Sequence, residues 1–173
     1  MGTALVTGAT SGIGEEFCWQ LAAAGHDLVL VARRDDTLRA LADSLANVAG
    51  VRAEVIAADL STDSGCARVA ARLDVGGPAD REKPDLAPVD LLVNNAGFGL
   101  GTDFLDNSLD NEINGLNVMV RAVMTLAHHA GISMRSRGRG AILNVGSVAS
   151  RTGAGTYSAH KAWVVAFTEG LAA

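Results

Sequence analysis

Short runs of apolar residues recur along the chain, and each is followed by a longer segment whose apolar residues have helical spacing. The run Leu28–Val31 is continuously apolar, which is typical of strands buried on both faces of a parallel sheet. The expected strands are Thr3–Thr7, Leu28–Val31, Val51–Ala57, Val89–Val93 and Ala141–Val145. The expected helices are Ile13–Ala24, Asp36–Asn47, Thr62–Leu73, Tyr157–Leu171 and a long helix within Asn111–Met134. This alternation predicts an α/β fold in which helices cover both faces of a parallel sheet.

Local signals mark the ends and faces of the first three helices. Gly25 follows the first helix, where a C-cap glycine belongs, and Ser61 is the expected N-cap of the third helix. The spacing places two sets of apolar residues on helical stripes, namely Ile13, Phe17 and Leu21 in the first helix and Leu38, Leu41 and Leu45 on the inner face of the second.

Composition excludes several classes of protein. Nineteen acidic residues against fourteen basic ones give a net charge of −5, which argues against a nucleic-acid binder. No apolar run reaches the roughly 20 residues of a membrane span, and the first residues lack the charged leader of a signal peptide. Cys18 and Cys66 lack CxxC spacing, so we expect neither a disulfide framework nor a structural zinc site. The expected compartment is therefore the reducing cytoplasm.

The three prolines, Pro78, Pro84 and Pro88, lie in a polar stretch between residues 74 and 88. Such a stretch could link two domains. The motifs on either side of it contribute to one site, however, so we expect a surface loop within a single domain of residues 1–173.

The segment Thr7–Gly14 lies at the junction of the first expected strand and helix. Its glycines allow a tight turn and the close approach of a ligand, and the helix N-terminus offers N–H groups and a positive dipole to an anion. The spacing is GxxxGxG and not the commoner GxGxxG, and an ordinary glycine-rich turn is the alternative. The position in a βαβ unit favours a site for the pyrophosphate of a dinucleotide.

The second strand is followed by Arg33 and Arg34, and no acidic residue occurs before Asp35. An acidic residue here would bind the ribose 2′-hydroxyl of NAD(H), whereas two guanidinium groups suit a 2′-phosphate. The arginines could also simply open an exposed helix. We predict NADP(H) in preference to NAD(H).

Tyr157, the only tyrosine of the chain, and Lys161 are four residues apart and share a helical face. A neighbouring ammonium lowers the pKa of a phenol toward the range useful for proton transfer. An exposed i,i+4 pair is the common alternative. Ser147 favours an acid–base site, because it follows the fifth strand at the end where ligands bind in open α/β sheets.

Taken in chain order, these motifs resemble those of the classical short-chain dehydrogenases/reductases, and they cover nearly the whole chain. The matching segments are Thr7–Gly14 for the TGxxxGIG cofactor loop, Asp59-Leu60 for the acidic position beside the adenine, Asn94-Asn95-Ala96-Gly97 for NNAG, Asn117 for the asparagine of the long helix, and Ser147, Tyr157 and Lys161 for the Ser…YxxxK set.

The resemblance implies a Rossmann-like doubly wound sheet and an NADP(H)-dependent oxidoreductase that interconverts a carbonyl and a secondary alcohol by hydride transfer. It implies Tyr157 as general acid/base, Lys161 as the residue that holds the nicotinamide ribose and lowers the phenol pKa, Ser147 as the donor to the substrate oxygen, and Asn117 as the anchor of a water relay. The cofactor-binding residues that it implies are Gly8, Thr10, Ser11, Gly12, Ile13, Gly14, Arg33, Arg34, Asp59, Leu60, Asn95, Ala96, Gly97, Tyr157 and Lys161. It implies no metal, and it implies a homodimer or homotetramer paired through Asn111–Met134 and Tyr157–Leu171.

The sequence departs from the family pattern in two places. The stretch from Ser147 to Tyr157 is a few residues shorter than the commonest spacing. The sequence ends at Ala173, inside the tyrosine-bearing helix, whereas the family continues with further strands and a substrate-covering loop. We therefore expect a C-terminally truncated member, and a non-catalytic NADP(H)-binding or inactive protein is the alternative.

The histidines of the chain do not fit a metal or catalytic role. His128 and His129 are adjacent on a helix, so their side chains point in different directions. His160 has no counterpart among the family's catalytic residues, and we expect it to pack in the core or at an interface.

Overall fold

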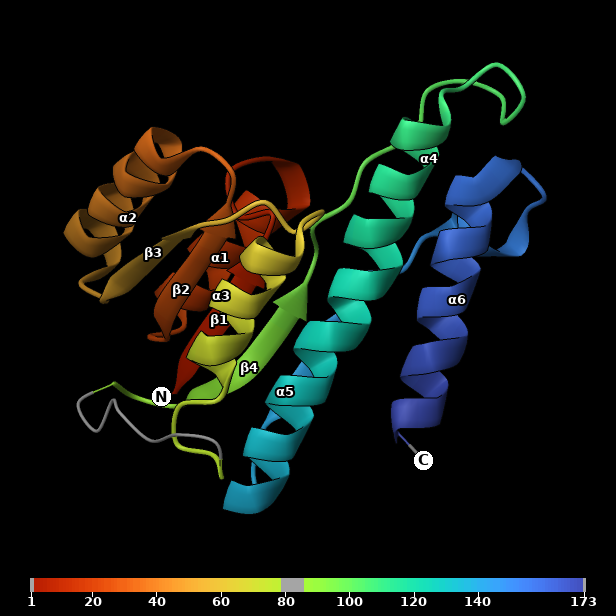
Figure 1. The fold of residues 1–173 in the computed structure, drawn as a ribbon. Helices are drawn as coiled ribbons and strands as arrows, with labels where there is room; N and C mark the ends of the chain where they lie inside the picture. Colours follow the sequence, from red (N-terminus) through yellow and green to blue (C-terminus); the bar gives the residue numbers. More distant parts are fainter. Residues whose placement is uncertain (1, 79–85, 173) are drawn as a thin grey trace.

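The computed structural model describes residues 2–78 and 86–172, so the expected loop between residues 74 and 88 lies partly outside the described residues. Its strands form one parallel sheet in the order β3-β2-β1-β4-β5 (Figure 1). The strands are β1 (Thr3–Thr7), β2 (Asp27–Ala32), β3 (Ala53–Ala57), β4 (Val89–Asn94) and β5 (Ala141–Asn144). The prediction of a doubly wound α/β sheet is confirmed.

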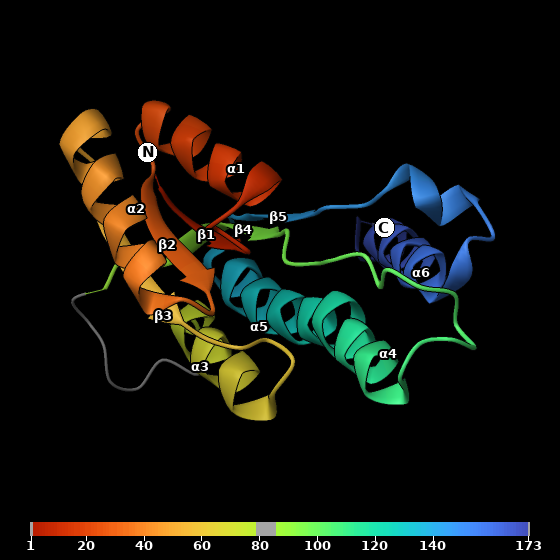
Figure 2. The same cartoon turned by 90° about the horizontal axis from the view of Figure 1, so that it is seen from above.

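The helices cover both faces of this sheet (Figure 2). They are α1 (Gly12–Ala23), α2 (Asp35–Ala49), α3 (Asp63–Leu73), α4 (Leu109–Leu116), α5 (Ala122–Arg137) and α6 (Gly155–Ala172). A π-helical segment, η1 (Asn117–Arg121), joins α4 to α5 into one long helix, and a 3-10 turn, η2 (Val148–Arg151), precedes α6. Figures 1 and 2 show α6 lying beside the long helix.

The core consists of two apolar layers that share the central strands. Leu5 of β1 and Val31 of β2 pack with α3 and α5, whereas Val6 and Leu30 pack in the layer of α1 and α2. All four side chains are fully buried. Neighbouring residues of a strand point to opposite faces, so a strand covered on both sides must be apolar throughout.

Of the predicted apolar stripe of α1, Phe17 and Leu21 are partly buried against the core, but small residues of the helix pack closest to the sheet. Ile13 is 63% exposed, and the buried residues of α1 are Gly14, Cys18 and Ala22. A Cβ on Gly14 would lie 2.1 Å from the backbone oxygen of Gly8. Because the helix starts so close to the preceding loop, only small residues fit beneath its first turns.

Of the two predicted helix caps, the one at the end of α1 is confirmed and the one at the start of α3 is not. Gly25 has a φ of +82° and closes a Schellman motif, with N–H bonds from Gly25 to Ala22 O (2.8 Å) and from His26 to Leu21 O (3.0 Å). The prediction for Gly25 is therefore confirmed. Ser61 as N-cap of α3 is wrong, because Thr62 Oγ1 accepts the Gly65 N–H at 3.1 Å while Ser61 bonds to Asp59.

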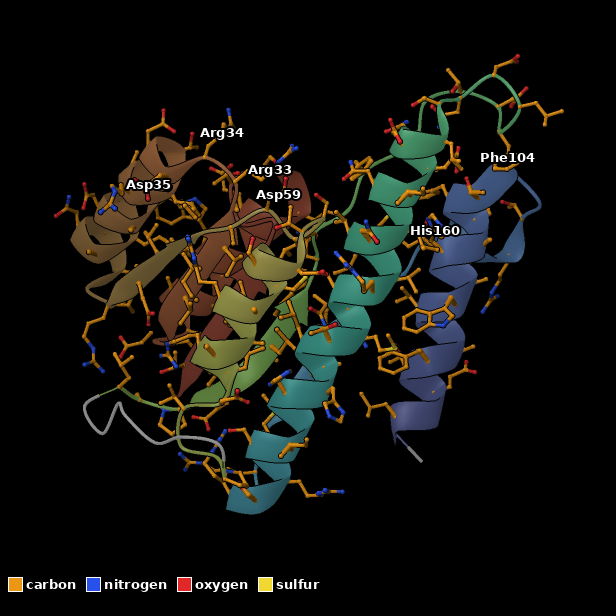
Figure 3. The ribbon with its side chains drawn as sticks, in the orientation of Figure 1. Arg33, Arg34, Asp35, Asp59, Phe104 and His160 are labelled. Atoms are coloured by element: carbon orange, nitrogen blue, oxygen red, sulfur yellow. The ribbon has the colours of Figure 1, made fainter. Side chains whose placement is uncertain are left out.

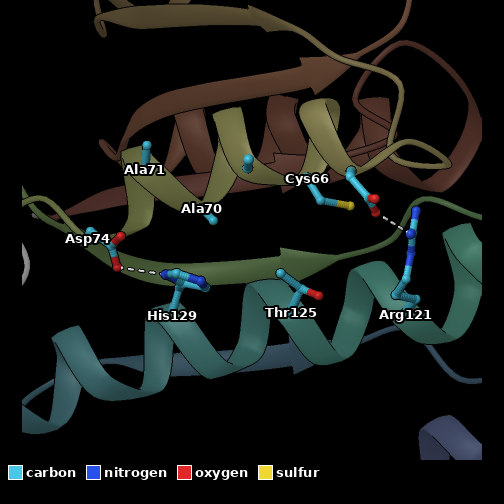
Figure 4. A pocket seen from close by; sticks show the side chains of 9 residues that line it. Cys66, Ala70, Ala71, Asp74, Arg121, Thr125 and His129 are labelled. Carbon is cyan, nitrogen blue, oxygen red and sulfur yellow. Dashed lines mark hydrogen bonds and ion pairs between the residues drawn. The ribbon is translucent and has the colours of Figure 1, made fainter.

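Two side-chain pairs join α3 and the residue that follows it to the long helix, across a shallow pocket of about 300 Å³ (Figure 4). Arg121 pairs with Asp63 at one end, and His129 Nδ1 lies 2.9 Å from Asp74 Oδ1 at the other. Cys66 lies between them, and both Cys66 and Cys18 are buried free thiols.

Within residues 2–78 and 86–172, no cluster of His, Cys, Asp and Glu could hold a metal ion. None of the described helices combines the length and the hydropathy needed to cross a membrane.

Candidate functional site

A cavity of about 500 Å³ opens at the carboxyl ends of the central strands. It brings together many of the predicted cofactor residues, namely Gly8, Thr10, Ser11, Arg33, Arg34, Asp59, Leu60, Ala96 and Gly97. Figure 3 shows Arg33, Arg34 and Asp59 close together at this end of the sheet. Its volume lies within the range of small-molecule sites, and its position is where ligands bind in open α/β sheets.

The glycine loop between β1 and α1 is shaped for a close backbone approach. Gly8 and Gly12 have φ values of +68° and +53°, which side-chain-bearing residues rarely adopt. A Cβ on Gly8 would lie 2.9 Å from Asn95 Nδ2. Ser11, at the N-cap of α1, makes no side-chain capping bond. The first turn of α1 therefore keeps N–H groups available for an anion.

Thr7 fastens this loop to the end of β4. Its hydroxyl oxygen accepts the backbone N–H groups of Asn95 (2.9 Å) and Ala96 (3.0 Å). In return, the Asn95 amide donates to Thr7 O at 3.0 Å. Asn95 thus acts through the loop backbone, and it does not line the cavity.

The rim of the cavity at β2 and β3 carries the two arginines Arg33 and Arg34, together with the carboxylate of Asp59. Arg33 and Arg34 form no ion pair with any other residue that the structure describes. The Asp59 carboxylate accepts the backbone N–H (2.9 Å) and the hydroxyl (2.8 Å) of Ser61. The bond from the Ser61 N–H is the largest cause of a lowered pKa for Asp59, and the charge of Arg33 adds to it. Two guanidinium groups without partners suit a phosphate ligand.

The predicted acid–base residues lie on α6 and on the segment after β5. Lys161 is 6% exposed, and its Nζ donates to Val145 O at 2.8 Å and lies 6.0 Å from the centre of the Tyr157 ring. Burial lowers the pKa of Lys161. The Ser147 hydroxyl oxygen accepts the Ala149 N–H at 3.1 Å. The phenol of Tyr157 makes no hydrogen bond with the other described residues, so it is available to a ligand.

The cavity ends next to Lys161. Gly97 lines the cavity, and a Cβ on Gly97 would lie 3.7 Å from Lys161 Nζ. A ligand that fills the cavity toward Gly97 would therefore approach the buried ammonium. Asn117 begins the π-helical segment η1 on the neighbouring helix.

Other predicted cofactor residues do not line the cavity. Gly12 and Gly14 shape the backbone beneath it, Ile13 is exposed, and Tyr157 and Lys161 lie beyond its end. The sequence analysis missed Phe98, Asn114 and Val118, which do line it. Asn114 and Val118 are one helical turn apart beside Asn117, and that spacing was the signal that could have identified them.

Comparisons with known proteins agree with this geometry. The family model described as short chain dehydrogenase matches residues 2–173. The NADP-dependent 3-hydroxy acid dehydrogenase of Schizosaccharomyces pombe is 32% identical over 98% of this chain and 64% of its own length. A 7beta-hydroxysteroid dehydrogenase of Collinsella aerofaciens is 30% identical over 97% of this chain and 61% of its own length.

Solved structures show the same relationship. A short-chain dehydrogenase from Sphingobium yanoikuyae in complex with NADPH has a TM-score of 0.89 and 34% identity, over 99% of this chain and 64% of that one. The L-sorbose reductase of Gluconobacter frateurii, complexed with NADPH and L-sorbose, has a TM-score of 0.87 and 30% identity, over 99% and 63%. The chain thus spans somewhat less than two thirds of the length of these relatives. The family model matches the chain throughout, and the Rossmann-like sheet and the glycine loop agree with it. This chain therefore belongs to the short-chain dehydrogenase family of oxidoreductases.

Proposed function

We propose that the chain binds NADP(H) and that the protein is an oxidoreductase that interconverts a carbonyl and a secondary alcohol. The observation that carries the proposal is the pair Arg33 and Arg34, which form no ion pair within the described part of the chain, on the rim of a cavity that a glycine loop helps to line. The Sphingobium yanoikuyae dehydrogenase and the Gluconobacter frateurii L-sorbose reductase are both complexes with NADPH, which supports the same cofactor here.

The residues present fit such a cofactor. Gly8, Thr10 and Ser11 would hold the diphosphate, because a backbone without side chains meets a helix N-terminus there. Arg33 and Arg34 would hold the 2′-phosphate, and Asp59 and Leu60 would border the adenine. When bound, the nicotinamide supplies the hydride.

The chain's own residues would transfer the proton and stabilise the charges that form. Tyr157 would donate its phenolic proton to the carbonyl oxygen in reduction, and would accept the hydroxyl proton in oxidation. The buried Lys161 ammonium, 6.0 Å from the ring, would stabilise the phenolate. The Ser147 oxygen already accepts an N–H bond, so its hydroxyl proton remains free to donate to the substrate oxygen. Asn117 would anchor a water that links Lys161 to solvent.

Absorbance of reduced nicotinamide, followed with a panel of ketones and aldehydes, tests this chemistry. We expect NADPH oxidation that a Tyr157→Phe variant loses by at least ~100-fold, because the phenol is the proton donor. Turnover that persists in Tyr157→Phe would remove Tyr157 from this role. Binding of NADP(H) without turnover on any member of the panel would favour a non-catalytic protein.

We further propose that the protein is a homodimer or homotetramer. Ile113 and Leu116 of α4 and Met124 of α5 are each close to half exposed although apolar. Figure 1 shows α6 beside the long helix that carries them. Analytical ultracentrifugation tests this proposal, and a single monomeric species at micromolar concentration contradicts it.

Buried free thiols at Cys18 and Cys66 suit a reducing compartment, so we propose a cytoplasmic location.

A further inference from the structure

Glu112 of α4 is a buried acidic residue that does not line the cavity. It is also not one of the predicted acid–base residues Ser147, Tyr157 and Lys161, which we call the acid–base cluster. Its side chain is buried at 7% exposure, and it forms no ion pair with the described residues. A carboxylate removed from water in this way is costly unless hydrogen bonds compensate it. The bonds that it makes therefore indicate why an acidic residue occupies this position.

Both oxygens of Glu112 accept hydrogen bonds from other segments. Oε1 accepts from Asn107 Nδ2 at 2.7 Å, and Oε2 accepts from the Thr156 hydroxyl. Asn107 is itself oriented, because its side-chain oxygen accepts from Asn111 Nδ2 and from the Ser108 N–H, each at 3.0 Å. The carboxylate is thus held in place by Asn107 and is hydrogen-bonded to Thr156 in the first turn of α6.

A separate contact fixes the other side of Tyr157. The Ser158 hydroxyl donates to Ala154 O at 3.1 Å and lies 3.1 Å from Thr152 Oγ1, which donates to Ala149 O at 3.0 Å. This chain ties α6 to η2. The two residues that flank Tyr157, Thr156 and Ser158, are therefore each anchored to a different neighbouring element.

His160 of α6 lies in the same interface, and among the described residues it forms no ion pair with Glu112. Its side chain points from α6 toward α4 (Figure 3), and it is 6% exposed. Its Nδ1 is buried and has no hydrogen-bond partner among the residues that the structure describes. Burial lowers the pKa of His160 more than the nearby Glu112 carboxylate raises it, which favours the uncharged imidazole. A Cβ on Gly115 would lie 3.6 Å from His160 Cε1, which shows how closely the two helices approach.

We propose that Glu112 is a positioning residue for the acid–base cluster, and that it fixes the helical turn carrying Tyr157 through its bond to Thr156. The inference rests on the proposed role of Tyr157. A displacement of about 1 Å at a reacting group can lower the rate on the order of 100-fold. The bond from Thr156, the residue before Tyr157, can therefore affect turnover.

The single tyrosine provides a readout that does not depend on turnover. Protein labelled with ¹³C-tyrosine gives ring signals from Tyr157 alone. The test compares Thr156→Val, which keeps the side-chain shape without the hydroxyl, with Thr156→Ser, which restores the hydroxyl. Glu112→Ala removes the acceptor and also relieves the buried charge, so it serves if Thr156→Val folds poorly. Asp110→Asn is the matched control, because it removes a carboxylate from an exposed position of the same helix.

We expect Thr156→Val and Glu112→Ala to shift and broaden the Tyr157 ring signals, and the double variant to add nothing further, since both remove one bond. Turnover should fall ~10-fold in kcat with KM for NADPH within ~2-fold, because neither residue lines the cavity. Thr156→Ser and Asp110→Asn should match the unsubstituted protein.

Unchanged ring signals in both Thr156→Val and Glu112→Ala would overturn the inference, as would strictly additive effects in the double variant. An equal change in Asp110→Asn would also overturn it, since the effect would then be one of charge alone. If the unsubstituted protein bound NADP(H) but reduced nothing, the proposed function would fail while the ring signals still decided whether Glu112 positions Tyr157.

Discussion

Replacing Gly14 by alanine sets two well-characterised effects against each other. Gly14 is a helical residue of α1 with an ordinary negative φ, so alanine would normally stabilise the helix by up to ~1 kcal/mol. Its new Cβ, however, would lie 2.1 Å from Gly8 O and 2.4 Å from Asn95 Nδ2. To restore van der Waals separation from a backbone atom, α1 would have to retreat by about 1 Å.

The steric cost exceeds the gain in helix propensity. Overpacking by one methyl group typically costs ~1–3 kcal/mol, and here the contact is with backbone that cannot rotate away. We expect a net destabilisation of ~2 kcal/mol, which lowers the Tm by roughly 4–8 °C for a chain of this length. The retreat also opens the loop that holds Gly8, so the affinity for NADP(H) should fall as well.

Thermal unfolding followed by circular dichroism, together with NADPH fluorescence titration, measures both effects. Gly131→Ala in α5 is the matched control, because its Cβ would meet nothing within 4 Å, and we expect it to raise Tm slightly. A Gly14→Ala protein as stable as Gly131→Ala, with unchanged NADPH affinity, would refute the close-approach argument.

Three further outcomes follow from the described contacts. Thr7→Val leaves the Asn95 and Ala96 N–H groups without their acceptor, so the free energy of unfolding in urea should fall by ~2–3 kcal/mol. A fall of less than ~0.5 kcal/mol would contradict the role of the Thr7 hydroxyl in joining the loop to β4. Burial raises the pKa of Cys18 to about 12, so native Cys18 should resist Ellman's reagent at pH 8 and react once the protein is unfolded in urea; fast labelling of the native protein would count against its burial. The Arg52 side-chain bonds lower the pKa of Asp27 below its unfolded value, so their stabilisation is fully present above that unfolded value and is lost as pH falls through the folded one. Arg52→Ala should therefore destabilise by less than ~1 kcal/mol at pH 7, with a difference that shrinks below pH ~4, and a difference that grows in acid would contradict the assignment.

The strands and most helices could be predicted from the sequence because their signals are local. Continuous apolar runs give β1 and β2 within a residue or two, and the inner face of α2 (Leu38, Leu41 and Leu45) follows from spacing alone. The order of strands in the sheet is a long-range property, and only the resemblance to a family indicated it.

The features that were missed depend on contacts between distant segments. Ile13 matched an apolar stripe, yet the approach of α1 to Gly8 selects the smallest residues for the inner face. Glu112 in an expected helix would be assigned to solvent, since only the arrival of Thr156 from α6 supplies its buried partner. The cavity residue Phe98 likewise has no spacing signal in the sequence, and only the fold places it in the same lining as Asn114 and Val118 of the long helix.

Isothermal calorimetry with NADPH and NADH tests the central claim most directly. The structure predicts tighter binding of NADPH, and a loss of ~10–100-fold in NADPH affinity for Arg33→Ala with little change for NADH, since a charge-assisted bond to the 2′-phosphate is removed. Arg135→Ala, which removes the same charge from an exposed position on α5, should leave both affinities unchanged. Equal losses for the two cofactors in Arg33→Ala, or no loss at all, would contradict the assignment of this cavity to NADP(H).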